Sequence, residues 1–155
     1  MIGFEYYNPA KIVFGEGSEK SLAKLLKQNN VKSLLLVTSG DFVETLGIYD
    51  VIRDAVKELD IKFSESREVV PNPSIELVRK LVEQGKKDEV DFVLAVGGGS
   101  SIDTAKAIAI GIPYEGDVWD FFSNGAVPEK VLGIGVIATT ASSGSETSNA
   151  AILSY

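Results

Sequence analysis

The residues best suited to chemistry lie in the stretch "VLAVGGGSSIDTAK", which spans residues 93–106. Its apolar run ends in three glycines, and serines, an acid and a lysine follow at helical spacing. Glycines let the backbone approach a phosphate closely, and the start of a helix offers unpaired N–H groups and a positive dipole end. The stretch departs from the G-x-G-x-x-G pattern because Ile102 holds the third glycine's place. We interpret the turn as a phosphate cradle, and a plain tight turn with positive φ is the alternative. The cradle residues are Gly97, Gly98, Gly99 and Ser100.

Two charged residues follow the glycines on the predicted helix 101–110. Asp103 lies three residues after Ser100, so the pair could form a capping box with Asp in place of Glu. An acid there also complements the helix dipole, but it would repel a pyrophosphate placed directly against it. The functional alternative is therefore a hydrogen bond from a hydroxyl of the substrate or of the nicotinamide ribose. We expect Lys106 to form a solvated ion pair with Asp103 at i,i+3 spacing.

Three further loops rich in small and polar residues follow predicted strands. They contain Ser39, Gly40 and Asp41; Asn72 between two prolines; and the stretch "TTASSGSE" at residues 139–146. The carboxyl ends of parallel strands share one rim of a sheet, where ligands bind near the switch in strand order. We therefore expect these loops to meet the glycine turn. Asp41 could accept a hydrogen bond from an adenosine ribose 2′-hydroxyl, or it could cap the next turn.

The elements that must position these loops alternate between strand and helix. The pattern predicts strands at residues 11–15, 33–38, 61–70, 91–96 and 131–140, with another begun at 150–155. It predicts helices at 18–28, 47–59, 75–87 and 101–110, the first and third capped by Ser18 and Ser74, and a short helical turn at 117–123. This order predicts an α/β fold: a Rossmann-like, mostly parallel sheet with helices on both faces, in a single domain spanning residues 1–155.

The composition narrows the function classes. The net charge of −7 lacks the basic footprint of nucleic-acid binding, and no basic amphipathic segment suggests a membrane surface. The chain has no cysteine, which excludes disulfides and thiolate metal sites, and no histidine, the commonest general base and transition-metal ligand. The first residues lack a signal-peptide layout, and no apolar run reaches the ~18 residues of a membrane span. A soluble cytoplasmic protein is expected.

Five stretches taken together resemble a known family. "YYNPAKIVFGEGS", "VPNPS", "AVGGGSSIDTAKAIA", "DVWDFF" and "IATTASSGSETSNAAI" occur in order over essentially the whole chain. They are similar to the iron-containing (group III) alcohol dehydrogenases, and most similar to the butanol-dehydrogenase branch. The combination of GGGSxxDxAK with TTAxxGSE is highly specific for that family.

The resemblance implies an NAD(P)-dependent oxidoreductase of primary alcohols and aldehydes, whose first domain binds the dinucleotide. It places the pyrophosphate at the GGGS turn and Asp103 near the nicotinamide and substrate. It places Asn72 beside the adenosine part. Nucleotide contacts are implied for Thr139, Thr140 and Ser143, the last of which stands where many members have Thr. A homo-oligomer is expected.

The resemblance also implies a metal, Fe²⁺ or Zn²⁺, held by one Asp and three His in a following helical domain. The chain has no histidine and stops at Tyr155 inside an apolar run. We therefore expect the C-terminal metal-binding domain to be absent, and the isolated chain to bind nucleotide without catalysis. NAD-preferring members often carry Asp at the strand end where our alignment places Gly40, so NADP is slightly favoured.

Two other functions remain open from the sequence alone. The dehydroquinate-synthase relatives share a GGGxxxD turn, so a lyase domain of that kind is one alternative, although "TTASSGSE" and "DTAK" fit the dehydrogenases better. The other alternative is a stand-alone nucleotide-binding or oligomerisation module without catalysis.

Overall fold

A computed structural model describes residues 3–5 and 7–155. Four strands form one parallel sheet in the order β2-β1-β3-β4. They are β1 (Ser33–Thr38), β2 (Lys62–Ser66), β3 (Phe92–Gly97) and β4 (Gly133–Ala138). The strands predicted around these positions are confirmed, and β2 is shorter than the expected 61–70 because its pairing with β1 ends at Ser66.

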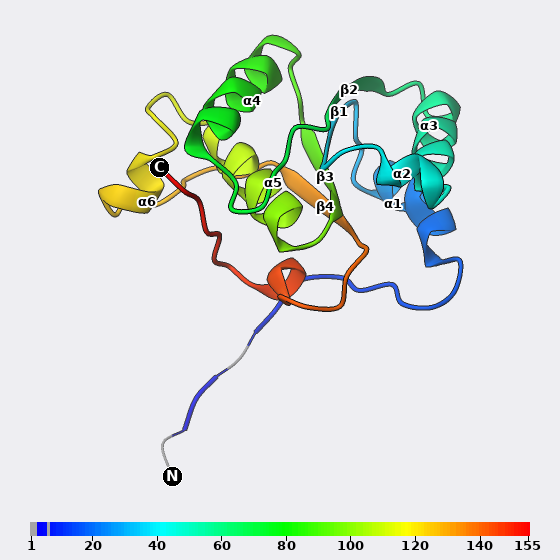
Figure 1. The fold of residues 1–155 in the computed structure, drawn as a ribbon, viewed down its shortest axis with the longest axis horizontal. Coiled ribbons are helices and arrows are strands. Elements are labelled where there is room, and N and C mark those ends of the chain that lie inside the picture. Colours follow the sequence, from blue (N-terminus) through cyan, green and yellow to red (C-terminus); the bar gives the residue numbers. More distant parts are fainter. Residues whose placement is uncertain (1–2, 6) are drawn as a thin grey trace.

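Helices cover both faces of the sheet (Figure 1). On one face lie α4 and α5, and on the other lie α1 and α3. The helices are α1 (Leu22–Gln28), α2 (Phe42–Thr45), α3 (Ile48–Glu58), α4 (Ile75–Lys87), α5 (Gly99–Gly111) and α6 (Asp120–Ser123), with 3₁₀ turns η1 (Ser18–Ser21) and η2 (Ser145–Thr147). This arrangement confirms the Rossmann-like fold in a single domain. Among the described residues, every helix falls short of the length and apolarity needed to cross a membrane.

The two central strands are buried along their whole length because each of their faces packs against helices. In β1, Leu35 and Val37 pack toward α4 and α5, whereas Leu34 and Leu36 pack toward α1 and α3. Side chains alternate between the faces of a strand, so a strand covered on both sides is apolar at every position. This explains the continuous apolar runs of β1 and β3, which are rigid supports for the loops at their ends.

One of the two predicted helix caps is confirmed. The hydroxyl of Ser74 accepts a hydrogen bond from the N–H of Leu77 at 3.3 Å, at the start of α4. The cap predicted at Ser18 is wrong. Gly17, with φ of 75°, leads into a 3₁₀ turn there, and no side chain caps that turn or α1.

Two predicted strands are also wrong. Residues 11–15 form no strand, and the side chains of Ile12 and Phe14 are 68% and 98% exposed. Near the other end, residues 150–155 form only an isolated parallel bridge between Ser154 and Ser74. Neither segment pairs with a strand of the four-stranded sheet.

Candidate functional site

The strand order identifies where a ligand would bind. β1 connects through α3 to β2 on one side, and the chain then returns through α4 to β3 on the other side. The direction of winding therefore changes between β1 and β3. In sheets of this kind the loops that leave the carboxyl ends of those two strands separate and form the binding crevice. Here those loops are residues 39–41 and residues 97–100.

The glycine turn leads directly from β3 into α5. Gly97 has φ of 145°, a conformation that side-chain-bearing residues rarely adopt. Gly98 is extended and flanks the first turn of α5, which has no side-chain cap among the described residues. The first N–H groups of a helix have no partner within the helix. The turn therefore presents unpaired donors and a positive dipole end, which fit a pyrophosphate.

The loop after β4 lies against this turn. The N–H of Thr139 donates to the carbonyl of Gly97 at 3.1 Å. A Cβ atom at Gly98 would lie 3.7 Å from Oγ1 of Thr140, and one at Gly99 would lie 3.0 Å from Oγ of Ser143. The structure thus brings the glycines together with hydroxyls of the third predicted loop, and the missing Cβ of Gly99 is what lets Ser143 approach this closely.

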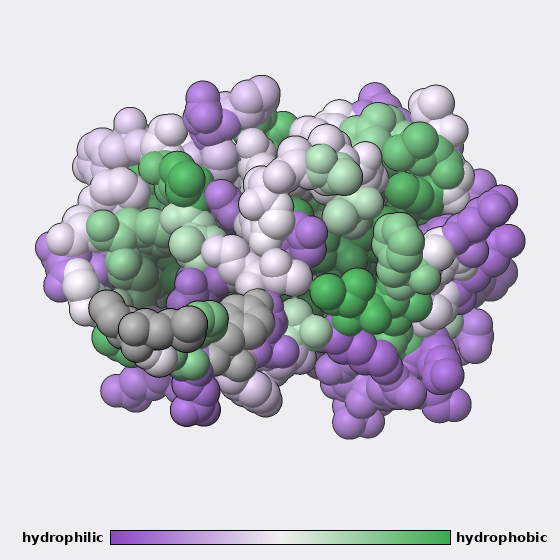
Figure 2. Space-filling view, turned by 90° about the horizontal axis from the view of Figure 1, so that it is seen from below, coloured by the Kyte–Doolittle hydropathy of each residue, from purple (hydrophilic) through white to green (hydrophobic). Residues whose placement is uncertain are grey.

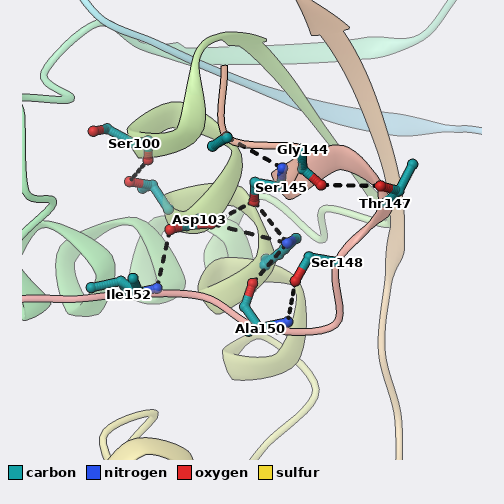
Figure 3. Close-up of polar contacts among 11 residues, drawn as sticks. Ser100, Asp103, Gly144, Ser145, Thr147, Ser148, Ala150 and Ile152 are labelled. Carbon is teal, nitrogen blue, oxygen red and sulfur yellow. Dashed lines mark hydrogen bonds and ion pairs between the residues drawn. The ribbon is translucent and has the colours of Figure 1, made fainter. Parts of the chain in front are cut away.

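Asp103 does not cap α5, which rules out the capping-box alternative. Its carboxylate accepts a hydrogen bond from the hydroxyl of Ser145 at 2.6 Å and another from the N–H of Ile152 at 3.1 Å (Figure 3). Its side chain is only 15% exposed. The reason is geometric: Asp103 lies a full turn inside α5, which begins at Gly99, so it faces the chain that returns from β4.

Lys106 is also held by this returning chain. Its ammonium group donates to the hydroxyl of Ser145 and to the carbonyl of Ala150, both at 2.8 Å, and lies 4.0 Å from the carboxylate of Asp103. The predicted ion pair with Asp103 is present, but its side chains are largely buried rather than solvated. Burial lowers the pKa of Lys106, and the charge of Asp103 opposes that effect.

The loop after β1 is tied to the chain that follows β2. The N–H of Gly40 donates to the carbonyl of Arg67 at 2.9 Å. The side chain of Arg67 in turn donates to the carboxylate of Asp41 at 2.8 Å. Asp41 flanks the start of α2 but makes no side-chain cap there. Its carboxylate is 84% exposed, which leaves it free to meet a ligand hydroxyl.

Two other polar residues lie at or after the carboxyl ends of strands. The hydroxyl of Thr38, at the carboxyl end of β1, is fully buried and has no hydrogen-bond partner among the described residues. Asn72 is exposed in the left-handed region, with φ of 57°, after the edge strand β2. Because β1 lies between β2 and β3, the loop of Asn72 is one strand further from the glycine turn than that of Asp41.

The rim is an open surface in this chain. One surface hollow is lined by residues between Arg53 and Phe63, and another lies between α5 and residues 127–130. Both lie toward the amino ends of the strands. Figure 2, seen from the side on which η2 lies, shows apolar groups separated by a paler, more polar band.

The described residues do not fit an iron ion. Within the part of the chain that the structure describes, no three Asp, Glu, His or Cys side chains gather to hold a metal. The sequence also lacks histidine. No step of chemistry is therefore assigned to a metal in this chain.

Sequence reasoning missed two residues of this rim. Ser145 is buried and joins Asp103 to Lys106, although it lies inside the hydroxyl-rich stretch that the sequence singled out. Arg67 follows β2 and contacts the loop after β1. Its signal was a single basic residue among acids, in "SESREVV", within the strand predicted at 61–70.

The chain matches the family model of the iron-containing alcohol dehydrogenases over residues 9–155. It is 42% identical over 146 residues to the probable NADH-dependent butanol dehydrogenase 2 of Bacillus subtilis, covering 94% of this chain and 37% of that protein. It is 39% identical over 154 residues to the NADH-dependent butanol dehydrogenase A of Clostridium acetobutylicum, covering 99% and 39%.

Two solved structures are similar throughout the fold. The NADH-dependent butanol dehydrogenase A of Thermotoga maritima matches with a TM-score of 0.87 and 39% identity, over 92% of this chain and 36% of that one. The sulfoacetaldehyde reductase of Bifidobacterium kashiwanohense, solved with NAD⁺, matches with a TM-score of 0.87 and 29% identity, over 99% and 40%. The chain thus spans between 36% and 40% of the length of these four proteins.

Proposed function

Because this chain belongs to the iron-containing alcohol dehydrogenase family, we propose that it is the nicotinamide-dinucleotide-binding part of an enzyme that interconverts primary alcohols and aldehydes. One observation carries the proposal. Three glycines lead into the uncapped start of α5, at the point where the winding of the sheet changes direction. That combination supplies backbone donors and a positive dipole end for a pyrophosphate.

In this proposal, different loops of the rim contact different parts of the dinucleotide. Gly97, Gly98, Gly99 and Ser100 bind the pyrophosphate through backbone N–H groups, and Thr139, Thr140 and Ser143 contact the nucleotide from the facing loop. Ser39, Gly40, Asp41 and Asn72 line the adenosine end. The bound nicotinamide supplies hydride transfer, and the protein supplies its position and surroundings.

Asp103 takes a positioning role in this proposal. Its two carboxylate oxygens already accept hydrogen bonds from Ser145 and Ile152. It therefore fixes the chain that returns from β4 beside the start of α5, near the nicotinamide end. The metal ligands belong, in this proposal, to the part of the relatives that the chain does not cover. The homo-oligomer, the cytoplasmic location and the lack of catalysis by the chain alone stay predictions.

Cofactor choice is part of the same proposal. The sequence favoured NADP slightly, because Gly40 stands where NAD-preferring members often carry Asp. The exposed carboxylate of Asp41, one residue on, suits a ribose 2′-hydroxyl and repels a 2′-phosphate. The butanol dehydrogenases of Bacillus subtilis and Clostridium acetobutylicum are named as NADH-dependent. We therefore propose NADH as the preferred cofactor.

Calorimetric titration of the chain with NADH tests the proposal. The Gly98→Ala variant places a methyl group in the cradle, where it lies an ordinary 3.7 Å from Thr140, so the fold is expected to survive. We expect NADH to bind the wild-type chain and the Gly3→Ala control, and to bind Gly98→Ala at least tenfold more weakly. Equal binding by all three would show that the glycine turn is only a turn. Absence of binding to the folded wild-type chain would overturn the proposed site.

A further inference from the structure

Arg67, to which the nucleotide proposal gives no role, is the centre of a charged cluster. Its Nη1 group donates to the carboxylates of Asp41 and Glu44, and its Nε and Nη2 groups lie 3.2 Å from a carboxylate oxygen of Glu65. The guanidinium also stacks 4.8 Å from the ring centre of Tyr49, whose hydroxyl donates to Glu65. Hydrogen bonds to Asp41 and Glu44 raise the pKa of Arg67 above its ordinary value.

The cluster lies at the adenosine end of the proposed site. The backbone of Arg67 accepts a hydrogen bond from Gly40, and an antiparallel bridge joins Ser39 to Glu68. These contacts fix Arg67 beside the loop that leaves β1. The side chain of Arg67 is 26% exposed, whereas that of Asp41 is 84% exposed. The guanidinium therefore lies behind the carboxylate that faces solvent.

The charges of this cluster do not balance. Three carboxylates surround one guanidinium, and together they leave an excess of negative charge at the place where the adenosine ribose would lie. A planar guanidinium pairs with phosphate as readily as with carboxylate, through the same N–H groups. In this structure Asp41 and Glu44 share Nη1 of Arg67. They occupy the donors that a ribose 2′-phosphate would need, and their charge repels it.

We propose, on the basis of the dinucleotide site proposed above, that Arg67 is a specificity-determining residue whose phosphate-binding donors are blocked by Asp41 and Glu44. The blocked arginine holds Asp41 in place for a ribose 2′-hydroxyl, so the chain takes NADH and rejects NADPH. Neutralising the two acids turns the same arginine into a ligand for the 2′-phosphate. The specificity thus depends on which partner accepts the hydrogen bonds of Nη1, at one edge of the guanidinium.

The test measures the dissociation constants of NADH and NADPH by calorimetry for four forms of the chain. They are the wild type, Asp41→Asn/Glu44→Gln, the same double variant with Arg67→Gln, and the control Asp54→Asn/Glu58→Gln. The control also removes one Asp and one Glu charge, but from exposed positions on α3. We expect the wild type and control to bind NADH at least tenfold more tightly than NADPH. We expect the double variant to shift the ratio tenfold or more toward NADPH, and the added Arg67→Gln to abolish that shift.

Several results would overturn the inference. They are an unchanged NADH to NADPH ratio in the double variant, the same shift in the control, or a shift that persists without Arg67. A merely structural role for Arg67 would change both affinities together and leave their ratio unaltered. If Arg67→Gln prevents folding, Arg67→Lys in the double variant replaces it, and a lysine without the planar fork is expected to retain less than half of the shift. Failure of the wild type to bind either cofactor would instead overturn the proposed function, and this inference with it.

Discussion

Asp103 and Ser145 are 42 residues apart in the sequence, yet the Ser145 hydroxyl donates to the Asp103 carboxylate at 2.6 Å. The second oxygen of the same carboxylate accepts from the N–H of Ile152. The helix that follows the glycine turn therefore holds the chain that returns from β4. A change at Asp103 acts on the position of that chain as well as on α5.

Replacement of Asp103 by Ala is expected to lower the free energy of unfolding by about 1–3 kcal/mol, because a largely buried acceptor of two hydrogen bonds is lost. The amide of Ile152 should also exchange with solvent faster. Urea unfolding and hydrogen exchange measure the two effects. Asp54→Ala, at an exposed position of α3, is the control and should change stability by less than ~0.5 kcal/mol. If both variants unfold alike, the observed contacts of Asp103 do not stabilise the fold.

Ser74→Ala and Ser18→Ala form a matched pair. Only Ser74 accepts a hydrogen bond from the backbone at the start of its helix. Loss of such a cap costs about 0.5–2 kcal/mol, so Ser74→Ala should unfold at a lower urea concentration. Ser18→Ala should unfold at the same urea concentration as the wild type. A larger loss for Ser18→Ala than for Ser74→Ala would contradict the structure of both helix starts.

Gly97→Ala and Gly98→Ala should differ in stability although they are neighbours. A Cβ at Gly97 would lie 2.6 Å from Oγ of Ser101, in a backbone with φ of 145°. Such strain costs roughly 1–3 kcal/mol. Gly98 is extended, and its Cβ would meet only ordinary contacts. The midpoint temperature of thermal unfolding should therefore be lower for Gly97→Ala than for Gly98→Ala. Equal midpoints would show that the backbone of the turn adopts another conformation.

Stability below neutral pH depends in part on Asp117. The hydrogen bond from Arg79 holds the pKa of Asp117 below its ordinary value, and the N–H of Trp119 adds to the effect. Because the folded chain binds this proton more weakly, the contribution is present above the ordinary pKa of Asp, ~3.9. It is lost as the pH falls through the lower folded value.

Asp117→Asn tests this dependence. The variant should be less stable than the wild type at pH 7, and the two should converge as the pH falls below ~4. Urea unfolding at several pH values gives the comparison. A difference that stays constant across that range would mean that Asp117 contributes through its shape rather than its charge.

The sequence was enough to predict the parts of the fold that depend on local pattern. The apolar runs of β1 and β3 are buried on both faces, so their composition alone identifies them. The glycine turn meets the loop after β4, and the loop after β1 leaves the same rim, because parallel strands bring their carboxyl ends to one edge of the sheet. The cap at Ser74 follows from residue type next to a strongly periodic helix.

Features that depend on long-range contacts were beyond the sequence. The partners of Asp103 lie 42 and 49 residues away, so the local pattern could offer a capping box as one alternative but could not reveal these contacts. The role of Arg67 depends on the pairing of β1 with β2, which brings it to Asp41. Residues 11–15 have strand-like composition, but strand formation requires a neighbour to pair with, and the sheet offers them none.

The central claim is that the dinucleotide lies on the rim formed by the glycine turn and its neighbouring loops. Titration of the ¹⁵N-labelled chain with NADH, followed by two-dimensional NMR of assigned backbone amides, tests it most directly. We predict that the amides of residues 39–41, 97–101 and 139–143 shift in a saturable manner, while those lining the hollow between Arg53 and Phe63 do not. Saturable shifts confined to that hollow, or no shifts in a folded chain, would contradict the account.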